Sequence, residues 1–371
     1  MKKLLPEVCT IQYGFPFDSA KFSDSDGMPL IRIRDVVRGY SETYTTEEYK
    51  SEYIVHENDL LIGMDGEFNI AKWGKTPALL NQRVCRLAPK DSIDKDYLFY
   101  FMPIALKRIE EKTPFVTVKH LSAKELNKIE IPVLSLEEQR KIAETLSKVD
   151  ELIAFRDQQL AKLDELVKAR FVEMFGESEY PCNSLISLII EGAGLSYGIV
   201  QPGDDGTGDM GVLRPVDFAD GKIKTDSIKY IDRSLGDGFK KTELNGNELL
   251  ITVRGTTGIT ALTDSRFKGM NVTRGIAVIR YDKKKVDPIY LNEYIKMEKS
   301  QQYIKEHTRG ATLQQINLSE LRDLEIVIPP LPLQRVFATF VEHVDQQKQT
   351  VQQSLEKLEL LKKALMQEYF G

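Results

Sequence analysis

Apolar residues recur at heptad spacing in two segments of the chain. The seam positions are Ile142, Leu146, Val149, Ile153, Leu160, Leu163 and Val167 in the first segment and Val344, Val351, Leu355, Leu358 and Leu365 in the second. A stripe that repeats every seven residues keeps one side of a helix on a partner helix, so the pattern predicts two long paired helices. The alternative is an ordinary amphipathic helix packed on its own domain. Because a whole domain separates the segments, we expect an antiparallel pair, each helix a spacer of about 57 Å.

The two segments end the matching halves of an internal repeat. Residues 121–176 align with residues 316–371 without a gap. Upstream, Tyr13-Gly14 matches Tyr197-Gly198 and Tyr97-Leu98 matches Tyr290-Leu291, in the same order along both halves. The repeat therefore predicts a unit used twice. The expected boundaries are a first globular domain, its helix, a second globular domain and its helix, at residues 1–133, 134–176, 177–329 and 330–371.

The globular halves have a mostly β pattern. Short apolar runs such as Asp59–Met64, Glu248–Arg254 and Ile276–Arg280 are separated by Gly, Pro, Asn and Asp. Ser135 followed by Glu138 indicates a helix start of the capping-box type. The predicted fold class is α+β: two similar globular domains joined by two long helices in an antiparallel coiled coil, with approximate two-fold symmetry.

Composition narrows the class of protein. Hydrophobic residues make up 42% and charged residues 29% of 371 residues, as in soluble globular proteins. Pro6 and Glu7 interrupt any apolar signal core, so we expect a cytoplasmic location. Cys9, Cys85 and Cys182 are widely spaced and form no CxxC pair, so neither a disulfide framework nor a metal site is expected. The net charge of −5 weighs against a nucleic-acid partner, although a local basic patch matters more than the sum.

Catalytic motifs are missing from the sequence. Trp73–Thr76 has the end of a phosphate-binding loop, but Asn69 stands where its first glycine belongs. Arg254–Gly258 is rich in glycine, yet no downstream dinucleotide fingerprint follows it. Neither a GxSxG elbow nor an amino-methyltransferase motif is present. We therefore expect no catalytic residues and no cofactor in this chain, although scattered carboxylates could still form a nuclease site.

Polar loops in both halves contain the residue types that contact DNA. Arg, Lys, Asn and Gln side chains recognise base edges and phosphates, although such residues are also common in solvated turns. The candidate DNA-binding residues are Arg32, Arg34, Lys72, Lys75, Gln82, Arg83, Lys119 and His120 in the first half, and Arg214, Arg254, Thr256, Thr257, Arg274, Arg309, Gln314 and Gln315 in the second.

The order of these features resembles the specificity (S) subunit of type I restriction–modification enzymes. The resemblance covers the full chain and rests on Leu60–Phe68, Ile129–Pro132 with Leu136–Arg140, Ser196–Gly203 and Ile328–Gln334. It implies that each globular domain is a target recognition domain reading one half of an asymmetric bipartite sequence in double-stranded DNA. It also implies that the helices set the spacing and dock two modification (methyltransferase) subunits, which bind S-adenosylmethionine. Restriction (translocase/endonuclease) subunits would complete the complex, and no membrane is involved.

Two other classes of protein compete with this interpretation. A coiled-coil adaptor with protein-binding globular ends would show no salt-dependent affinity for DNA, whereas phosphate binding weakens steeply with salt. A nuclease or methyltransferase with an unrecognised site would be active as the purified chain alone. The compact length and the acidic net charge depart modestly from the family pattern.

Overall fold

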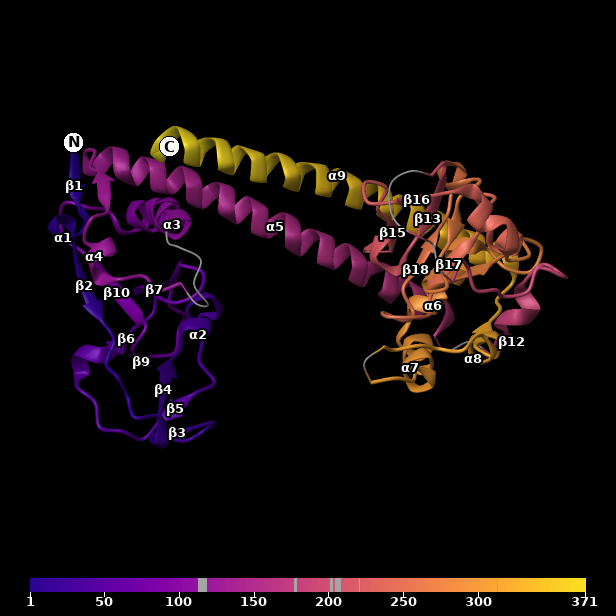
Figure 1. The fold of residues 1–371 in the computed structure, drawn as a ribbon, viewed down its shortest axis with the longest axis horizontal. Coiled ribbons are helices and arrows are strands. Elements are labelled where there is room, and N and C mark those ends of the chain that lie inside the picture. Colours follow the sequence, from indigo (N-terminus) through magenta and orange to yellow (C-terminus); the bar gives the residue numbers. More distant parts are fainter. Residues whose placement is uncertain (113–118, 177–178, 201–202, 204–207, 220, 312) are drawn as a thin grey trace. The chain divides into compact units, whose positions relative to one another are not determined.

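Two compact units make up the structure, a computed structural model that describes residues 1–112, 119–176, 179–200, 203, 208–219, 221–311 and 313–371 (Figure 1). Unit 1 consists of Met1–Gln158 and Gln352–Gly371, and unit 2 consists of Gln159–Val351. The 40-residue helices α5 (Leu136–Phe175) and α9 (Leu331–Phe370) are each shared between the units. Each unit therefore combines one globular domain with one stretch of both helices, a division that crosses the boundaries predicted from the sequence.

The globular part of unit 1 contains two sheets and a short strand pair. The strand orders of the two sheets are β2-β10-β7-β8 and β3-β5-β4-β9-β6, and the short pair is β1 with β11. The strands are β1 (Lys2–Leu4), β2 (Cys9–Tyr13), β3 (Phe22–Ser23), β4 (Met28–Ile31), β5 (Tyr44–Thr45), β6 (Ile54–Val55), β7 (Leu60–Gly63), β8 (Asn69–Lys72), β9 (Ala78–Leu80), β10 (Val84–Pro89) and β11 (Glu130–Pro132). The short helices are α1 (Leu5–Val8), α2 (Ile33–Arg38), α3 (Lys95–Lys112) and α4 (Ala123–Leu126), with 3-10 turns at Ser19–Lys21 and Ser51–Tyr53.

The globular part of unit 2 repeats this plan. Its strand orders are β18-β17-β20, β16-β13-β19, β14-β15 and β12-β21. The strands are β12 (Cys182–Ser184), β13 (Met210–Leu213), β14 (Phe218–Ala219), β15 (Lys222–Ile223), β16 (Lys229–Ile231), β17 (Leu249–Thr252), β18 (Thr260–Leu262), β19 (Asn271–Val272), β20 (Ile276–Ile279) and β21 (Glu325–Val327). The helices are α6 (Pro288–Lys296), α7 (Glu298–His307) and α8 (Leu318–Arg322), with 3-10 turns at Leu185–Leu188, Pro215–Asp217, Arg233–Thr242 and Ser265–Phe267.

The central strand of each unit is covered on both faces. In β7, Leu60 and Ile62 pack with the core around α3, whereas Leu61 packs with the opposite core around Trp73. The same holds in β17, where Leu249 and Ile251 pack in one core and Leu250 packs in another. Alternate residues of a strand point to opposite faces, so burial on both faces requires an uninterrupted apolar run. This explains why both runs lack alternation, and the predicted α+β class is confirmed.

A close backbone contact explains the matched glycines of the repeat. A Cβ atom at Gly14 would overlap the carbonyl oxygen of Asn81, and one at Gly198 would overlap the carbonyl oxygen of Val272. In both units the next residue lies opposite a parallel partner, in the bridges Phe15–Asn81 and Ile199–Thr273. Glycine is therefore required by space at equivalent places.

Antiparallel pairing of the two long helices is visible within each unit (Figure 1). In unit 1, the Lys362 Nζ lies 2.6 Å from the Asp150 Oδ1. In unit 2, the Lys348 Nζ lies 2.6 Å from the Asp164 Oδ1. The contact of α9 moves from Asp164 back to Asp150 on α5 as the chain of α9 advances from Lys348 to Lys362. The two helices therefore run in opposite directions, which confirms the predicted antiparallel coiled coil. Both aspartates come from α5 and both lysines from α9, so these two lysines are paired with carboxylates of the partner helix.

The seam residues predicted from the heptads are all buried or half-buried, while their place in a helix–helix seam stays a prediction. Seven are buried and five are half-buried: Leu146, Val149, Leu163, Val167, Val344, Val351 and Leu355 in the first group, and Ile142, Ile153, Leu160, Leu358 and Leu365 in the second. Burying this stripe offsets the cost of ordering two long helices.

Equivalent glutamines attach the start of each helix to its own domain. Gln139 is buried, and its Oε1 accepts from the Asp94 N–H at 2.8 Å. Gln334 is also buried, and its Oε1 accepts from the Asp287 N–H at 2.8 Å. The capping box predicted at Ser135 is present, since the Ser135 N–H donates to the Glu138 carboxylate at 3.0 Å.

Equivalent phenylalanines attach the end of each helix to the domain that precedes the other helix. The Phe370 ring of α9 packs against Tyr97 at a centroid distance of 5.2 Å within unit 1. The Phe175 ring of α5 packs against Tyr290 at 5.1 Å within unit 2. The hydroxyl groups of both tyrosines donate to main-chain carbonyls, on Pro132 and Val327 respectively. Each unit therefore needs both helices to complete its core.

Candidate nucleic-acid interface

A short two-strand bridge follows β7 in unit 1. The Gly66 N–H donates to the Lys119 carbonyl at 2.9 Å, and the Leu121 N–H donates to the Met64 carbonyl at 2.7 Å. Asp65 and His120 therefore lie opposite each other, although 55 positions separate them in the chain. We call Asp65, Gly66, Arg83 and His120 the first edge.

The first edge is organised around one carboxylate. The Asp65 Oδ1 lies 2.5 Å from the His120 Nδ1 and 3.4 Å from the Arg83 Nη1. The side chains of Arg83 and His120 are 52% and 48% exposed, whereas that of Asp65 is 19% exposed. Arg83 has a left-handed φ of 71°, which is uncommon for a residue other than glycine, and its carbonyl accepts from the Met64 N–H. The chain thus holds an imidazole and a guanidinium together at the surface.

The same bridge follows β17 in unit 2 with different side chains. The Gly255 N–H donates to the Gln314 carbonyl at 2.8 Å, and the Ile316 N–H donates to the Val253 carbonyl at 3.0 Å. Gln315 lies opposite both Arg254 and Arg309. Exposed Arg274 precedes Gly275, whose carbonyl accepts from the Val253 N–H at 2.8 Å. We define the second edge as Arg254, Gly255, Arg274, Arg309, Gln314 and Gln315, a set of guanidinium and amide groups in which the Arg309 Nη2 lies 4.0 Å from the Glu320 carboxylate.

Two predicted lysines of unit 1 are instead paired with α3. The Lys72 Nζ lies 2.8 Å from the Asp96 Oδ1 and 5.0 Å from the centre of the Phe99 ring. The Lys119 Nζ donates to the Glu110 carbonyl at 2.9 Å. These contacts neutralise or occupy the ammonium groups locally.

Two predicted arginines occupy equivalent capping positions. The Arg32 N–H donates to the Asp35 carboxylate at 2.8 Å, and the Arg214 N–H donates to the Asp217 carboxylate at 2.7 Å. The Arg214 guanidinium also donates to Asp217 and to the Ser227 carbonyl, at 3.1 Å and 2.6 Å. Arg214 therefore has a structural role, whereas the Arg32 side chain is exposed.

The remaining candidates are surface residues near these elements. Arg34 is 56% exposed, with its Nε 3.7 Å from the Asp35 carboxylate. The Thr257 hydroxyl lies 3.0 Å from the Thr308 hydroxyl. Lys75, Gln82 and Thr256 are exposed. The DNA-binding role of all sixteen residues stays a prediction. Asp65 is not among the sixteen candidates, although its carboxylate contacts His120 and Arg83.

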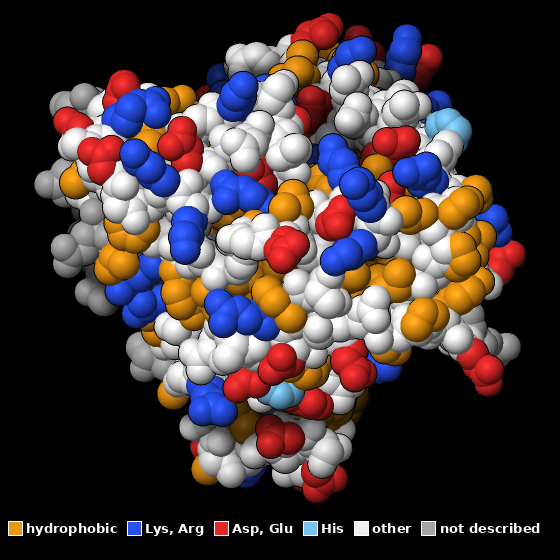
Figure 2. Space-filling view, turned by 90° about the vertical axis from the view of Figure 1, so that its right-hand side faces the viewer, with side chains coloured by type: hydrophobic (Ala, Val, Ile, Leu, Met, Phe, Trp, Pro, Cys, Tyr) orange, Lys and Arg blue, Asp and Glu red, His pale blue; other side chains and the backbone are white. Residues whose placement is uncertain are grey.

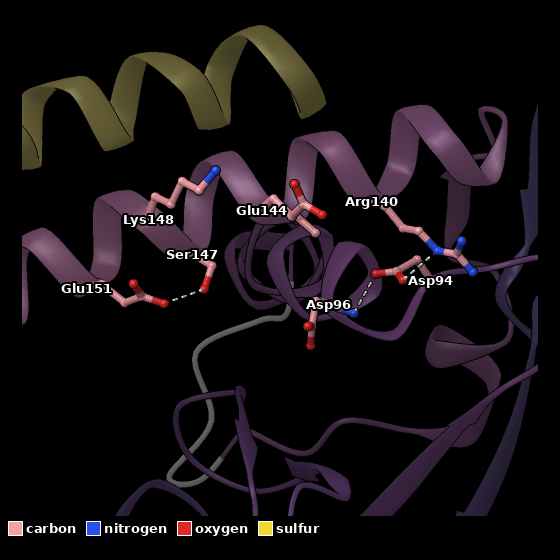
Figure 3. Close-up of a pocket in the computed structure, with 8 residues that line it drawn as sticks. Asp94, Asp96, Arg140, Glu144, Ser147, Lys148 and Glu151 are labelled. Carbon is pink, nitrogen blue, oxygen red and sulfur yellow. Dashed lines mark hydrogen bonds and ion pairs between the residues drawn. The ribbon is translucent and has the colours of Figure 1, made fainter.

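One cavity of unit 1 lies between the start of α5 and the residues at the start of α3 (Figure 3), and its Asp96 carboxylate is the partner of Lys72. It measures about 310 Å³ and is lined by Asp94, Asp96, Arg140, Ala143, Glu144, Ser147, Lys148 and Glu151. Its groups have local partners: the Arg140 Nε lies 3.9 Å from the Asp94 carboxylate, and the Ser147 hydroxyl donates to Glu151 at 3.4 Å. Within the described residues, no group of three or more His, Cys, Asp or Glu could hold a metal ion. The described helices also include none that is long and apolar enough to cross a membrane.

Strong pKa shifts occur in the cores of the units. Burial raises the pKa of the Tyr97 hydroxyl to about 12 and that of the Cys85 thiol to about 12. Burial and the nearby Glu248 and Asp287 carboxylates raise the pKa of Tyr281 to about 12. Each shift favours the neutral form and follows from packing, so these groups mark cores rather than an acid–base site.

Solved structures of S subunits have a similar fold. The S subunit of a type I restriction–modification system from M. genitalium covers 100% of this chain and 96% of its own, with a TM-score of 0.59 and 14% identity. A chain from a structure describing complex assembly and conformational transition of a type I restriction–modification system has a TM-score of 0.60 and 17% identity, covering 100% and 97%. At this identity the likeness concerns the fold alone.

Sequence comparison identifies the family. Residues 1–165 and 207–360 match the type I restriction modification DNA specificity domain, and the chain belongs to this family. It is 29% identical to the EcoBI specificity subunit of Escherichia coli over 373 residues, 92% of this chain and 78% of the relative. It is 25% identical to the putative MjaX specificity subunit of Methanocaldococcus jannaschii over 376 residues, 92% and 86% of the two chains. The family resemblance drawn from the sequence is confirmed.

Proposed function

We propose that this chain is the DNA-specificity subunit of a type I restriction–modification complex, in which each unit reads one half of an asymmetric bipartite target. The observation that carries the proposal is the repeated bridge, which has one backbone arrangement and two sets of polar side chains. Equivalent backbones place both edges in the same way on their domains, while different side chains require different bases. The target should therefore have two unlike halves.

Local charge supports DNA as the ligand despite the net charge of −5. In Figure 2, Lys and Arg side chains are spread over the face shown, between acidic and hydrophobic ones. The second edge gathers three arginines with two glutamines. Arginine reads guanine and glutamine reads adenine in the major groove, and cations bind phosphate.

The outer faces of the helices in unit 1 suggest where protein partners bind. Leu152 and Phe155 of α5 are 46% and 61% exposed, and Leu360 and Leu361 of α9 are 67% and 46% exposed. Exposed apolar side chains outside a paired seam fit helices of another protein. We assign this face to the modification subunits, which would bind S-adenosylmethionine and carry out methylation, with the restriction subunits joining the assembled complex.

We infer that this chain has no catalytic activity of its own. In the cavity beside α5, Arg140 and Ser147 are paired with Asp94 and Glu151, and the described residues of the two edges contain no general base aligned with a nucleophile. Activity would then require the partner subunits.

The test is a comparison of the purified chain with its assembly with modification subunits. We expect the assembly to bind duplex DNA with an affinity that falls steeply as salt rises, and only the assembly to methylate DNA. Replacing residues 1–130 with those of another family member should change one half of the methylated motif. Salt-independent binding, methylation by the chain alone, or a change in both halves would each contradict the proposal.

A further inference from the structure

The two edges occupy the same place in the two units, and the glycine of each edge is open to solvent within the described chain. Gly66 and Gly255 both have left-handed φ values, 77° and 85°, and no described atom lies within 4 Å of a Cβ built on either residue. Each glycine donates its N–H across the bridge, and the flanking side chains are exposed or, at Asp65, Arg254 and Gln315, half-buried. A glycine with open space outside it lets another backbone approach closely.

We propose that these two edges carry the contacts that discriminate between bases, and that Asp65 is a positioning residue for the first edge. The inference rests on the proposed function and deepens it by naming the reading groups. It assigns His120 and Arg83 to one half of the target, and Arg254 with Gln315 to the other half.

One carboxylate holds both side chains of the first edge. An ionised carboxylate only accepts, so the His120 Nδ1 must donate to Asp65 across their 2.5 Å separation. A lone pair on Nδ1 would instead face the carboxylate oxygen. The Arg83 Nη1, which can only donate, lies 3.2 Å from the same His120 Nδ1, so the imidazole, the guanidinium and the carboxylate are all in mutual contact. Arg83, whose Nη1 lies 3.4 Å from the same oxygen, adds guanidinium donors beside it. The first edge therefore offers the Nε2 of an imidazole and the donors of a guanidinium to a base pair.

The second edge offers mainly donors. The bridge places Arg254 opposite Gln315, and Arg309 is opposite Gln315 as well. A guanidinium reads the O6 and N7 acceptors of guanine, whereas a carboxamide pairs with the N6 and N7 of adenine. The second edge should therefore prefer purines, with Arg254 selecting guanine.

The experiment measures base preference and salt dependence separately. The purified assembly of the chain with its modification subunits is offered a library of randomised duplexes, and bound sequences are counted. The variants are Asp65→Asn, which keeps the side-chain size, His120→Gln, and Arg254→Gln. The matched controls are Lys50→Gln in unit 1, whose side chain is 81% exposed, and Arg266→Gln in unit 2, which follows the far end of β18.

We expect Asp65→Asn and His120→Gln to relax preference about 10- to 100-fold at one or two neighbouring positions of one half-site, as loss of a base contact does. Asp65→Asn should leave the salt dependence unchanged, because it removes no cation. Arg254→Gln should relax a guanine position in the other half, and the controls should change neither half.

Uniform weakening with base preference intact would overturn the inference, because it would mean that the edges hold phosphates or only the fold. Changes in both halves from one variant would also overturn it. If Asp65→Asn prevents assembly, His120→Gln decides the first edge, since it leaves the carboxylate in place. A wild-type assembly without base preference or salt dependence would instead contradict the proposed function itself.

Discussion

Replacing Gln139 with methionine tests how unit 1 holds the start of α5. The glutamine Oε1 accepts from the Asp94 N–H at 2.8 Å, and its Nε2 donates to the Leu134 and Ser92 carbonyls at 2.9 Å and 3.2 Å. Methionine fills a similar volume but leaves all three groups without this partner. An unsatisfied buried polar group costs about 1–3 kcal/mol. Because these bonds are part-buried, we expect unit 1 to lose about 2 kcal/mol of unfolding free energy.

The chain's single tryptophan makes the assay specific to unit 1. Trp73 is buried in the core of unit 1, so its fluorescence during urea denaturation reports the unfolding of that unit. The matched control is Gln158→Met, an exposed position on the same helix, which should shift the midpoint little. Equal midpoints for Gln139→Met and Gln158→Met would refute the reasoning, because the hydrogen bonds would then contribute nothing measurable.

Three further predictions concern the helix pair, the repeated glycine and the buried thiols. Alanine replacements at Lys362 and Asp150 should show a coupling energy of about 0.5–1 kcal/mol in a double-mutant cycle of unfolding free energies, as a partly exposed ion pair does. Additive effects would mean that this ion pair does not help to fix the register of the two helices. Gly14→Ala should destabilise unit 1 by more than about 2 kcal/mol, because the methyl group overlaps a neighbouring carbonyl oxygen; a midpoint within error of wild type would contradict this. Burial raises the pKa of Cys85 to about 12, so a thiol reagent at pH 8 should label exposed Cys182 alone in the folded protein, and all three cysteines after unfolding. The raised pKa also makes the unfolding free energy depend on pH, because thiols of the unfolded chain ionise near pH 8.5 whereas Cys85 stays neutral in the fold. The contribution of the buried neutral thiol is therefore full below about pH 8.5 and is lost as the pH rises toward about 12. A constant unfolding free energy across that range would refute this prediction.

The helix pair and the repeat could be predicted because both depend on local spacing. The heptads required a partner helix, and the matched residues Gln139 and Gln334 proved to make the same hydrogen bond in both units. The way in which the compact units share the helices was not predicted. It depends on Phe175 and Phe370, each of which fills a core formed by residues distant in the sequence.

The candidate site was harder to predict because side-chain partners are set by tertiary contacts. Lys72 and Lys119 looked available in the sequence, yet carboxylate and carbonyl groups of α3 occupy them. One signal was present: Arg214 is followed three residues later by Asp217, as Arg32 is by Asp35, a spacing that suits a capping position. Asp65 was missed because only the fold brings it to His120.

The most direct test of the account is adenine methylation mapping across the genome of cells that contain the modification subunit with and without this chain. We predict that deletion of the chain removes methylation from one split motif with two unlike halves, and that restoring the chain restores it. An unchanged methylation map would contradict the claim that this chain supplies DNA sequence specificity.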